Sequence, residues 1–460
     1  MRKIAAAGQG LSVALIDEAT APGGQVFRAP APGLELFAKY RDADSQAGDN
    51  LRRRVAEAAI AWRPGRRVWS ASRGFRVDAI GPQGTEAFTA PQLIAATGAH
   101  ERVIPFPGWT LPGVIGLAAA TILIKSQGIL PGQRLVVAGC GPLLALVAGK
   151  VISAGGEIAA LVDLAAPTDW ISAVPQMLRR FPLLRRGMGW VLSIGLARVP
   201  VYFRHTIAEA KGRERVERVL LRPVDRSGAL IPVAPTEIGV DALIIGHGLV
   251  PGAELPRLLN ARLEFDRRRG GWVPVLDRLM RTDVPGLFAV GDGAGISGAE
   301  PATLAGEIAG LTASLEAGRL SDAAHAHQTA ALSRRLEGYR PFADAMADLM
   351  ALRPGAVASI APETIVCRCE DITRRAIEAA ARDGALDVNQ LKHFTRCGMG
   401  PCQGRMCGDV AAEILADTHG ISRTAVGFWT GRPPLRPVAL EDLVGAFSYD
   451  DIPIPKPAPL

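Results

Sequence analysis

The stretch "QRLVVAGCGPLLALVAGKVISAGGEIAALVD", residues 133–163, constrains the fold of this 460-residue chain more than any other. An apolar strand runs into a glycine turn, a helix follows, and a second strand ends in Asp163. Gly139 permits a tight turn, and Gly141 lets backbone approach a pyrophosphate at the helix N-terminus. This order predicts a dinucleotide site in an α/β domain. The alternative is an α/β crossover that binds nothing, because Leu144 stands where the fingerprint wants a third glycine.

Short apolar runs alternate with helical periodicity across the first ~310 residues, which predicts an α/β fold with parallel strands. The predicted strands are Ser12–Ile16, Gln92–Ala96, Arg134–Ala138, Ile158–Val162, Ala242–Ile245 and Leu287–Val290. Residues 311–360 are predicted to be helical and connecting. The final stretch contains "RPPLRP" and "IPIPKPAPL", and its proline content predicts an extended tail.

A second dinucleotide-binding unit is predicted at the start of the chain. "LSVALIDEATAPGGQVFR" looks like the second strand of an FAD-binding unit, with Asp17 or Glu18 accepting hydrogen bonds from the adenosine ribose. Gly23, Gly24 and Gln25 are then the loop that runs under the flavin. The strand and the G-x-G-x-x-G turn that should come first are missing from this sequence. We expect either a chain start assigned too late or a lost affinity for FAD, and we favour the first because the downstream motifs look intact.

Two further stretches favour a flavin. "TDVPGLFAVGDGAG" places Gly291 where backbone closes on the ligand and Asp292 where a carboxylate accepts a hydrogen bond from the ribityl chain. A helix beginning near Pro301 would direct its N-terminal dipole toward the flavin pyrimidine. "LIAATGAHERVIPFPGW" supplies Thr97 and Gly98 at a strand end near the nucleotide. The three motifs in this order predict a flavoprotein with two dinucleotide-binding domains.

Five of the six cysteines lie in "VCRCEDIT" and "TRCGMGPCQGRMC" near the C-terminus. Cys367 and Cys369 form C-x-C, and Cys402 and Cys407 form C-x4-C. Four thiolates in two short pairs favour an iron–sulfur cluster, since short pairs lower the loop entropy of assembly. A helix is expected to begin at each pair, so that its N-terminal dipole favours the thiolates. A zinc site and unligated cysteines are the alternatives.

Cys397, Cys140 and His100 lie near the predicted sites but are not expected to act in them. Cys397 lies five residues before Cys402 and is a competing ligand. We expect it to stay outside the site, because the small-residue turn "GMGP" separates it from the others. Cys140, inside the nucleotide turn, is expected to be a small packed residue. His100, near the predicted flavin, is expected to be packed or solvent-facing rather than a proton donor.

Charge and composition indicate which classes of binding partner and which cellular compartment to expect. The formal charge is +7 and the pI is near 9.3, yet the arginines are scattered. This pattern predicts a solvated face and no nucleic-acid binding. No apolar run reaches the ~18–20 residues of a membrane span, and six cysteines are too sparse for a disulfide scaffold. We therefore expect a cytoplasmic protein.

The combination of motifs is specific although each motif alone is not. "IVCRCEDIT…TRCGMGPCQGRMC" resembles the bacterioferritin-associated-ferredoxin-type [2Fe-2S] domain. Joined to "ALIDEATAPGGQVFR", "ATGAHERVIPFPGWTLPGV" and "PGLFAVGDGAG", it resembles one flavoprotein family across almost the whole chain. That family comprises the large (A or alpha) subunits of opine oxidases, a flavoprotein subunit of hydrogen cyanide synthase and the alpha subunits of dye-linked proline dehydrogenases.

The resemblance implies an electron-transferring subunit of a hetero-oligomer. A smaller, amino-acid-oxidase-like flavoprotein partner takes hydride from a substrate C–N bond, and the subunit resembling this chain passes the electrons through FAD and a [2Fe-2S] cluster to an acceptor. The residues carried over are Asp17, Gly24, Gln25, Thr97, Gly98 and Asp292 for FAD, and Cys367, Cys369, Cys402 and Cys407 for the cluster. A further cofactor is either a second nucleotide, NAD(P) or ATP, facing Gly139 and Gly141, or an FMN at the subunit interface.

The motifs also predict a division into domains and leave two other functions open. The predicted parts are an FAD-binding domain (1–105 and 270–330), a second dinucleotide-binding domain (106–269), a helical linker (331–360), a [2Fe-2S]-binding domain (361–425) and a proline-rich tail (426–460). One alternative function is a stand-alone NAD(P)H-dependent reductase of the ferredoxin type. The other is a non-catalytic, cluster-bearing assembly subunit. No Ser–His–Asp arrangement or H-E-x-x-H motif is present, so no catalytic residue is predicted.

Overall fold

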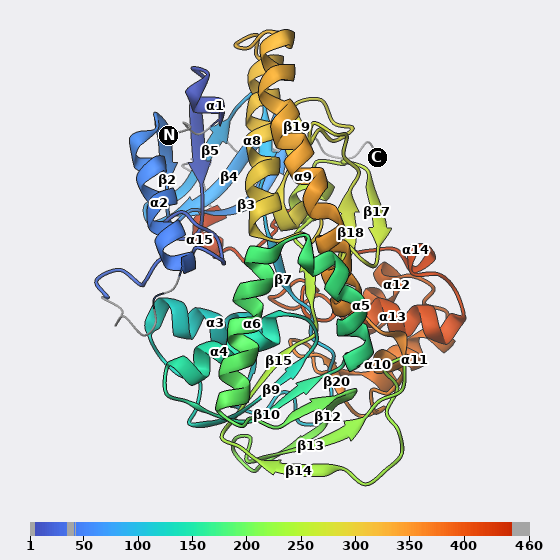
Figure 1. Cartoon of the computed structure of the whole chain (residues 1–460). Helices are drawn as coiled ribbons and strands as arrows, with labels where there is room; N and C mark the ends of the chain where they lie inside the picture. Colours follow the sequence, from blue (N-terminus) through green and yellow to red (C-terminus); the bar gives the residue numbers. More distant parts are fainter. Residues whose placement is uncertain (1–4, 35–40, 42, 444–460) are drawn as a thin grey trace, which may run out of the picture.

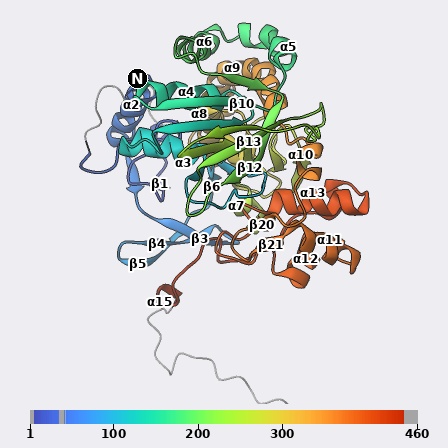
Figure 2. The same cartoon turned by 90° about the horizontal axis from the view of Figure 1, so that it is seen from below.

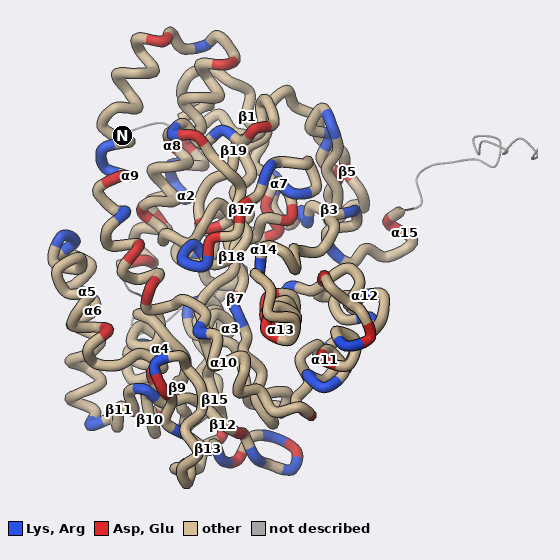
Figure 3. Tube along the Cα trace, turned by 90° about the vertical axis from the view of Figure 1, so that its right-hand side faces the viewer, with Lys and Arg blue, Asp and Glu red and all other residues tan. Residues whose placement is uncertain are grey.

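The computed structural model describes residues 5–34, 41 and 43–443 (Figure 1). An α/β body makes up most of the molecule, and a small, mainly helical domain that carries the cysteines lies against one side of it. Basic and acidic positions are interspersed along the described chain (Figure 3). The predicted fold class is confirmed.

The first α/β unit contains two parallel strand pairs. β1 (Val13–Ile16) pairs with β2 (Ile60–Arg63), and β6 (Leu93–Ala95) pairs with β19 (Leu287–Ala289). Within the described ranges, no strand joins these two pairs into one sheet. The unit also contains α1 (Ala5–Gly8), α2 (Ala43–Glu57) and an antiparallel sheet of β3 (Arg67–Ser72), β4 (Arg76–Gly81) and β5 (Gly84–Thr89).

The second α/β unit is built on a five-stranded parallel sheet in the order β11-β10-β9-β15-β8. Its strands are β8 (Val114–Gly116), β9 (Arg134–Gly139), β10 (Glu157–Asp163), β11 (Val201–Phe203) and β15 (Ala242–Gly246). Both faces of this sheet are covered, which is why the central strands are apolar along almost their whole length. Side chains alternate between the faces, as the strand geometry requires.

One face of the sheet packs on helices and the other on a second sheet (Figure 2). Leu135 and Val137 point to the helical side, while Val136 and Ala138 point to the sheet side. The helical side contains α3 (Leu117–Ile122), the π-helical turn η2 (Leu123–Gln127), α4 (Leu143–Ser153), α5 (Pro167–Leu178) and α6 (Phe181–Leu196). The sheet side contains antiparallel β12 (His205–Lys211), β13 (Arg218–Pro223) and β14 (Thr236–Gly239).

Several short elements connect the two units. They are β7 (Ala99–Glu101), β16 (Leu249–Pro251), α7 (Glu254–Leu258), β17 (Leu263–Asp266), β18 (Gly271–Pro274) and the 3-10 turn η3 (Gly291–Ala294). Two long helices, α8 (Ala299–Glu316) and α9 (Asp322–Met350), then lie side by side along the body (Figure 1). No helix in the described part of the chain has the length and apolar character needed to cross a bilayer.

The cysteine-bearing domain follows the long helices. Its elements are α10 (Pro354–Ala358), β20 (Ile365–Cys367), β21 (Ile372–Thr373), α11 (Arg374–Arg382), α12 (Val388–Thr395), α13 (Gly408–His419) and α14 (Arg423–Val426). They surround one apolar core in which Ile377, Leu391 and Ile414 are almost fully buried. This core also includes Trp429, so the packing of the domain extends past residue 425. A short helix, α15 (Leu440–Leu443), ends the described chain.

Candidate metal centre and nucleotide sites

The first cysteine pair lies on a β-hairpin. Cys367 is the last residue of β20, and Cys369 lies in the turn before β21. The helix predicted after the pair is confirmed as α11, whose N-cap Thr373 accepts a hydrogen bond from the Ala376 amide at 3.2 Å. The prediction that the first pair sits at this helix N-terminus is wrong, because the hairpin turn separates them. The second pair fits its prediction better, since Cys407 is the N-cap residue of α13.

Three buried sulfur atoms form the centre of the site. The Sγ atoms of Cys367, Cys397 and Cys407 all lie within 4.8 Å of one another. Cys397 Sγ is 3.8 Å from Cys407 Sγ. The expectation that the "GMGP" turn keeps Cys397 outside the site is wrong. Helix α12 ends at Thr395, and Arg396 follows in the left-handed conformation with φ 64°, which turns the chain back toward the other cysteines.

The other two cysteines lie beside this triad and closer to solvent. Cys369 is exposed and Cys402 is half-buried. Desolvation and the neighbouring Cys402 thiol raise the pKa of Cys369, although a backbone hydrogen bond opposes the shift. Gly400 packs directly on Cys369, since a Cβ there would lie 2.1 Å from Cys369 Cβ. The structure therefore brings all five C-terminal cysteines together.

The thiols of the buried triad interact electrostatically. Hydrogen bonds from Cys397 and Cys407 lower the pKa of Cys367 to about 2. The same contacts raise the pKa of Cys397 and of Cys407, because one thiolate is stabilised at the expense of its neighbours. A set of sulfur donors alone, in mutual contact, suits iron–sulfur chemistry or zinc. The residues present thus fit a thiolate-bound metal cluster.

An aromatic ring covers the cysteine loops. A Cβ added at Gly398, Gly404 or Gly408 would lie 2.8, 2.3 or 2.5 Å from the ring of Trp429. The glycines are therefore required for close packing of the two loop segments against the indole. Trp429 is 7% exposed. The sequence interpretation missed this residue, although the repeated glycines in "CGMGPCQGRMCG" were a signal for a large neighbour.

Buried ion pairs attach the cysteine domain to the α/β body. Arg102, just after β7, donates to Asp409 at 2.6 Å, and the side chains are 3% and 9% exposed. Arg423 donates to the other oxygen of Asp409 at 3.2 Å. Arg267 donates to Glu413 of α13 at 2.9 Å. These pairs fix α13, and with it Cys407, relative to the flavoprotein-like body.

The two strand ends predicted to face a flavin do meet. β6 and β19 are paired, and the turns after them cross so closely that a Cβ at Gly293 would lie 2.5 Å from Thr97 Oγ1. Gly98 has φ 69° and open space on its Cβ side. After Gly291, Asp292 accepts hydrogen bonds from the Ser297 and Gly298 amides at 2.9 and 3.0 Å, immediately before α8.

The predicted ribose and flavin loops are also formed. Burial raises the pKa of Asp17, which accepts a hydrogen bond from the Ala19 amide at 2.9 Å. A Cβ at Gly23 would lie 2.3 Å from the Phe27 carbonyl oxygen, so the loop is tightly turned, while Gly24 borders open space. Gln25 accepts a hydrogen bond from Arg28 at 2.8 Å. These residues fit the ribose and flavin ends of FAD.

The predicted turn of the second nucleotide unit contacts the chain's own side chains. A Cβ at Gly139 would lie 1.8 Å from the Gly246 carbonyl oxygen, and one at Gly141 would lie 2.4 Å from Met350 Cγ. Trp170 Nε1 donates to Asp163 at 2.8 Å. Cys140 is buried, and burial raises the pKa of its thiol to about 12, which agrees with a packed residue.

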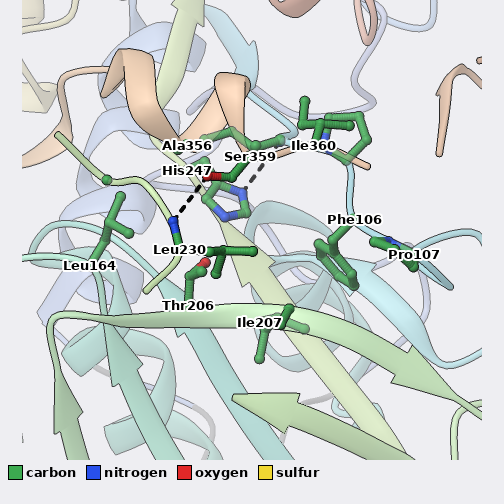
Figure 4. A pocket seen from close by; sticks show the side chains of 14 residues that line it. Phe106, Pro107, Leu164, Thr206, Ile207, Leu230, His247, Ala356, Ser359 and Ile360 are labelled. Atoms are coloured by element: carbon green, nitrogen blue, oxygen red, sulfur yellow. Dashed lines mark hydrogen bonds between the residues drawn. The ribbon is translucent and has the colours of Figure 1, made fainter. Parts of the chain in front are cut away.

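Two cavities lie where the cysteine domain meets the body. The first is mainly apolar and has no charged carboxylate, lysine or arginine in its lining; His247, Thr206 and Ser359 supply its polar groups (Figure 4). Burial lowers the pKa of His247 to about 4, so its ring is neutral. Such a lining does not suit a phosphate group. Leu230 N donates to Ser359 Oγ at 3.0 Å across this cavity.

The second cavity is charged and lies between β7 and the cysteine loop. Its lining includes His100, Glu254, Arg257 and the loop residues Gln403 and Arg405. Arg405 pairs with Glu254 at 2.8 Å, and desolvation lowers the pKa of His100. This cavity connects the strand that follows Gly98 to the segment between Cys402 and Cys407.

Comparisons with known proteins agree with this architecture. The family model described as pyridine nucleotide-disulphide oxidoreductase matches residues 2–330, and the one described as sarcosine oxidase A3 domain matches residues 361–446. The crystal structure of L-proline dehydrogenase from P. horikoshii has the same fold, with a TM-score of 0.69, 19% identity and coverage of 96% of this chain and 76% of that one.

Curated relatives match over almost the whole chain. The opine oxidase A subunit of Rhizobium meliloti is 33% identical, covering 95% of this chain and 84% of that protein. The HcnB subunit of hydrogen cyanide synthase from Pseudomonas protegens is 31% identical, covering 93% and 92%. The chain therefore belongs to the oxidoreductase family that includes the opine oxidase A subunits and the HcnB subunits of hydrogen cyanide synthase.

Proposed function

We propose that this chain is the electron-transferring FAD and [2Fe-2S] subunit of a heteromeric oxidase or dehydrogenase that acts on amines or amino acids of the opine type. A smaller, amino-acid-oxidase-like flavoprotein partner oxidises the C–N bond of the substrate. This chain takes up the electrons and passes them to an acceptor. The observation that carries the proposal is the cluster of the buried Cys367, Cys397 and Cys407 sulfurs, close to a charged cavity that is lined by His100 of β7 and by residues of the loop between Cys402 and Cys407.

We assign separate sets of residues to the iron–sulfur cluster and to FAD. Cys367, Cys369, Cys402 and Cys407 hold the cluster, which supplies one-electron transfer when it is bound. Asp17, Gly23, Gly24, Gln25, Thr97, Gly98, Gly291 and Asp292 contact the FAD. The helix α8 begins directly after the loop held by Asp292, so its positive end lies on the flavin side. Buried Arg102 and Asp409 hold the two sites in a fixed relation.

The partner is proposed from the relatives and from the chemistry of the chain. The relatives that match over almost the whole chain are named as subunits, of opine oxidase and of hydrogen cyanide synthase. A site made of thiolates and backbone turns transfers electrons but supplies no general base for breaking a C–H bond. The substrate pocket is therefore assigned to the partner.

A second nucleotide or an interface FMN stays a prediction. A nucleotide at Gly139 and Gly141 would displace Met350 from Gly141 and compete with Trp170 for Asp163. These contacts favour electron input from a protein partner over input from NAD(P)H. Bleaching of the flavin by NADH in the isolated protein would contradict that preference.

The test is a reconstitution. The chain is purified alone and with a co-expressed small flavoprotein encoded next to it, and reduction of an artificial dye is followed with amino acids and opines as donors. We expect dye reduction only with both proteins present. Full substrate oxidation by this chain alone would refute the proposal. Loss of dye reduction in a Cys407→Ser complex that still contains flavin would place the cluster on the electron path.

A further inference from the structure

We propose that the cluster has five cysteine ligands available for four positions, and that Cys397 takes the fourth position when Cys369 leaves it. The inference rests on the proposed [2Fe-2S] cluster and concerns only which sulfurs hold it. Cys367, Cys402 and Cys407 are the constant ligands. Cys369 and Cys397 are the exchangeable ones.

The positions of the sulfurs support this division. A [2Fe-2S] cluster takes four protein ligands, two on each iron. Cys397 Sγ is 3.8 Å from Cys407 Sγ and within 4.8 Å of Cys367 Sγ, so it lies within the ligand shell rather than behind it. Its side chain is 0% exposed. No movement of the backbone across the domain is needed for it to reach a metal bound by Cys367 and Cys407.

Cys369 is the ligand most easily lost. It is exposed, whereas Cys367 and Cys407 are each 1% exposed. It lies in a hairpin turn rather than inside a regular element, and Asp371 in the same turn has φ 51°. The sulfur of Cys369 is therefore accessible to solvent, while Cys397 is shielded by the core.

The environment of Cys397 does not match that of a merely packed cysteine. Two cysteine sulfurs, those of Cys367 and Cys407, lie beside its own sulfur. The backbone N–H of Cys397 donates to Thr395 Oγ1 at 3.1 Å, which holds Cys397 in place at the end of α12. Cys140 provides the contrast, since it packs in a cluster with Leu164 and Val224 that contains no second cysteine. Exchange from an exposed to a buried ligand would also change the solvent exposure of the cluster, which is one determinant of its reduction potential.

The experiment compares four forms of the full chain prepared without oxygen: wild type, Cys369→Ser, Cys397→Ser and the double variant. Iron and acid-labile sulfide are measured, and the dithionite-reduced samples are examined by electron paramagnetic resonance. We expect Cys369→Ser to keep iron within a factor of about two of wild type, with shifted g values, because a cysteine in a new position has replaced the lost ligand. Cys397→Ser should keep both the iron and the wild-type spectrum.

The double variant should lose the cluster, and circular dichroism shows whether it is folded. Complete loss of iron in Cys369→Ser alone would overturn the inference while leaving the cluster itself intact in wild type. Retention of iron with an unchanged spectrum in Cys369→Ser would also overturn it, since no exchange would then have occurred. Loss of iron in Cys397→Ser would overturn it by making that residue obligatory. Absence of iron in the wild type would instead refute the proposed function.

Discussion

Arg102 Nε lies 2.6 Å from Asp409 Oδ2, so the residue after β7 is joined to α13, the helix whose N-cap is Cys407. Both side chains are almost completely buried, so water cannot replace a lost partner. We expect Arg102→Met to lower the free energy of unfolding by about 1–3 kcal/mol, because Asp409 keeps its pair with Arg423 but loses one buried hydrogen-bond donor. Urea denaturation followed by circular dichroism measures the change.

The matched control is Arg268→Met. Arg268 pairs with Asp348 at 2.8 Å, but those side chains are 63% and 52% exposed. An exposed pair contributes only about 0–1 kcal/mol. Equal losses in the two variants would show that the Arg102–Asp409 pair does not anchor the cysteine domain.

Gly400→Ala should weaken the cluster. The new Cβ would lie 2.1 Å from Cys369 Cβ, so either the loop that contains Gly400 or the β20–β21 hairpin must move. This movement would separate the sulfurs of Cys369 and Cys402. We expect cluster affinity to fall on the order of tenfold, as for other losses of support behind a ligand. Gly306→Ala in α8 is the control, because its Cβ meets nothing within 4 Å. Iron content after mild chelation distinguishes the two variants, and equal retention would contradict the prediction.

Trp429→Ala should lower the stability of the cysteine-bearing domain. The ring fills the space left by three glycines and is 7% exposed, so removing it leaves a cavity that costs about 3–5 kcal/mol. Phe394→Ala, in the same domain but 50% exposed, should cost much less. Thermal unfolding followed by circular dichroism makes the comparison. A loss for Phe394→Ala as large as that for Trp429→Ala would contradict the assigned packing.

Glu101 should make stability depend on pH. Desolvation raises the pKa of its carboxyl from 4.5 to about 7, despite the hydrogen bond that it accepts from the Ala118 amide at 2.6 Å. The folded state therefore binds a proton that the unfolded state has released, and the free energy of unfolding falls as pH rises from 4.5 to about 7. At 1.36 kcal/mol per unit the fall is on the order of 3 kcal/mol.

Glu101→Gln removes this contribution, since an amide does not ionise and still offers an oxygen to Ala118. Urea midpoints of both proteins at pH 5 and pH 7 test the point. The difference between variant and wild type should grow in favour of the variant at pH 7. Parallel pH profiles would refute the assignment.

The sequence predicted the strands well because each is a short apolar run bounded by turn residues. The residues after Arg134 in Arg134–Ala138, and those of Ala242–Ile245, are buried on both faces of a parallel sheet, and such strands leave an uninterrupted apolar signal. The gathering of Thr97, Gly98 and Asp292 was also predictable, since the carboxyl ends of neighbouring parallel strands meet at one edge.

The arrangement of the metal centre was harder to predict from the sequence. The inward turn of Cys397 depends on the left-handed Arg396 after α12, a conformation that propensity does not predict for arginine. Arg102 and Asp409 are 307 positions apart, and nothing local marks two charged residues as buried partners. Trp429 lies in a stretch whose prolines predicted an extended tail, and only its tertiary packing places it over the cysteine loops.

The most direct measurement is the iron and acid-labile sulfide content of the anaerobically purified chain, together with its electron paramagnetic resonance spectrum after reduction. Wild type should contain iron and sulfide in equal amounts and give the signal of a reduced [2Fe-2S] cluster, and Cys407→Ser should contain neither. A wild-type protein without iron, or a Cys407→Ser variant with unchanged iron, would contradict the account.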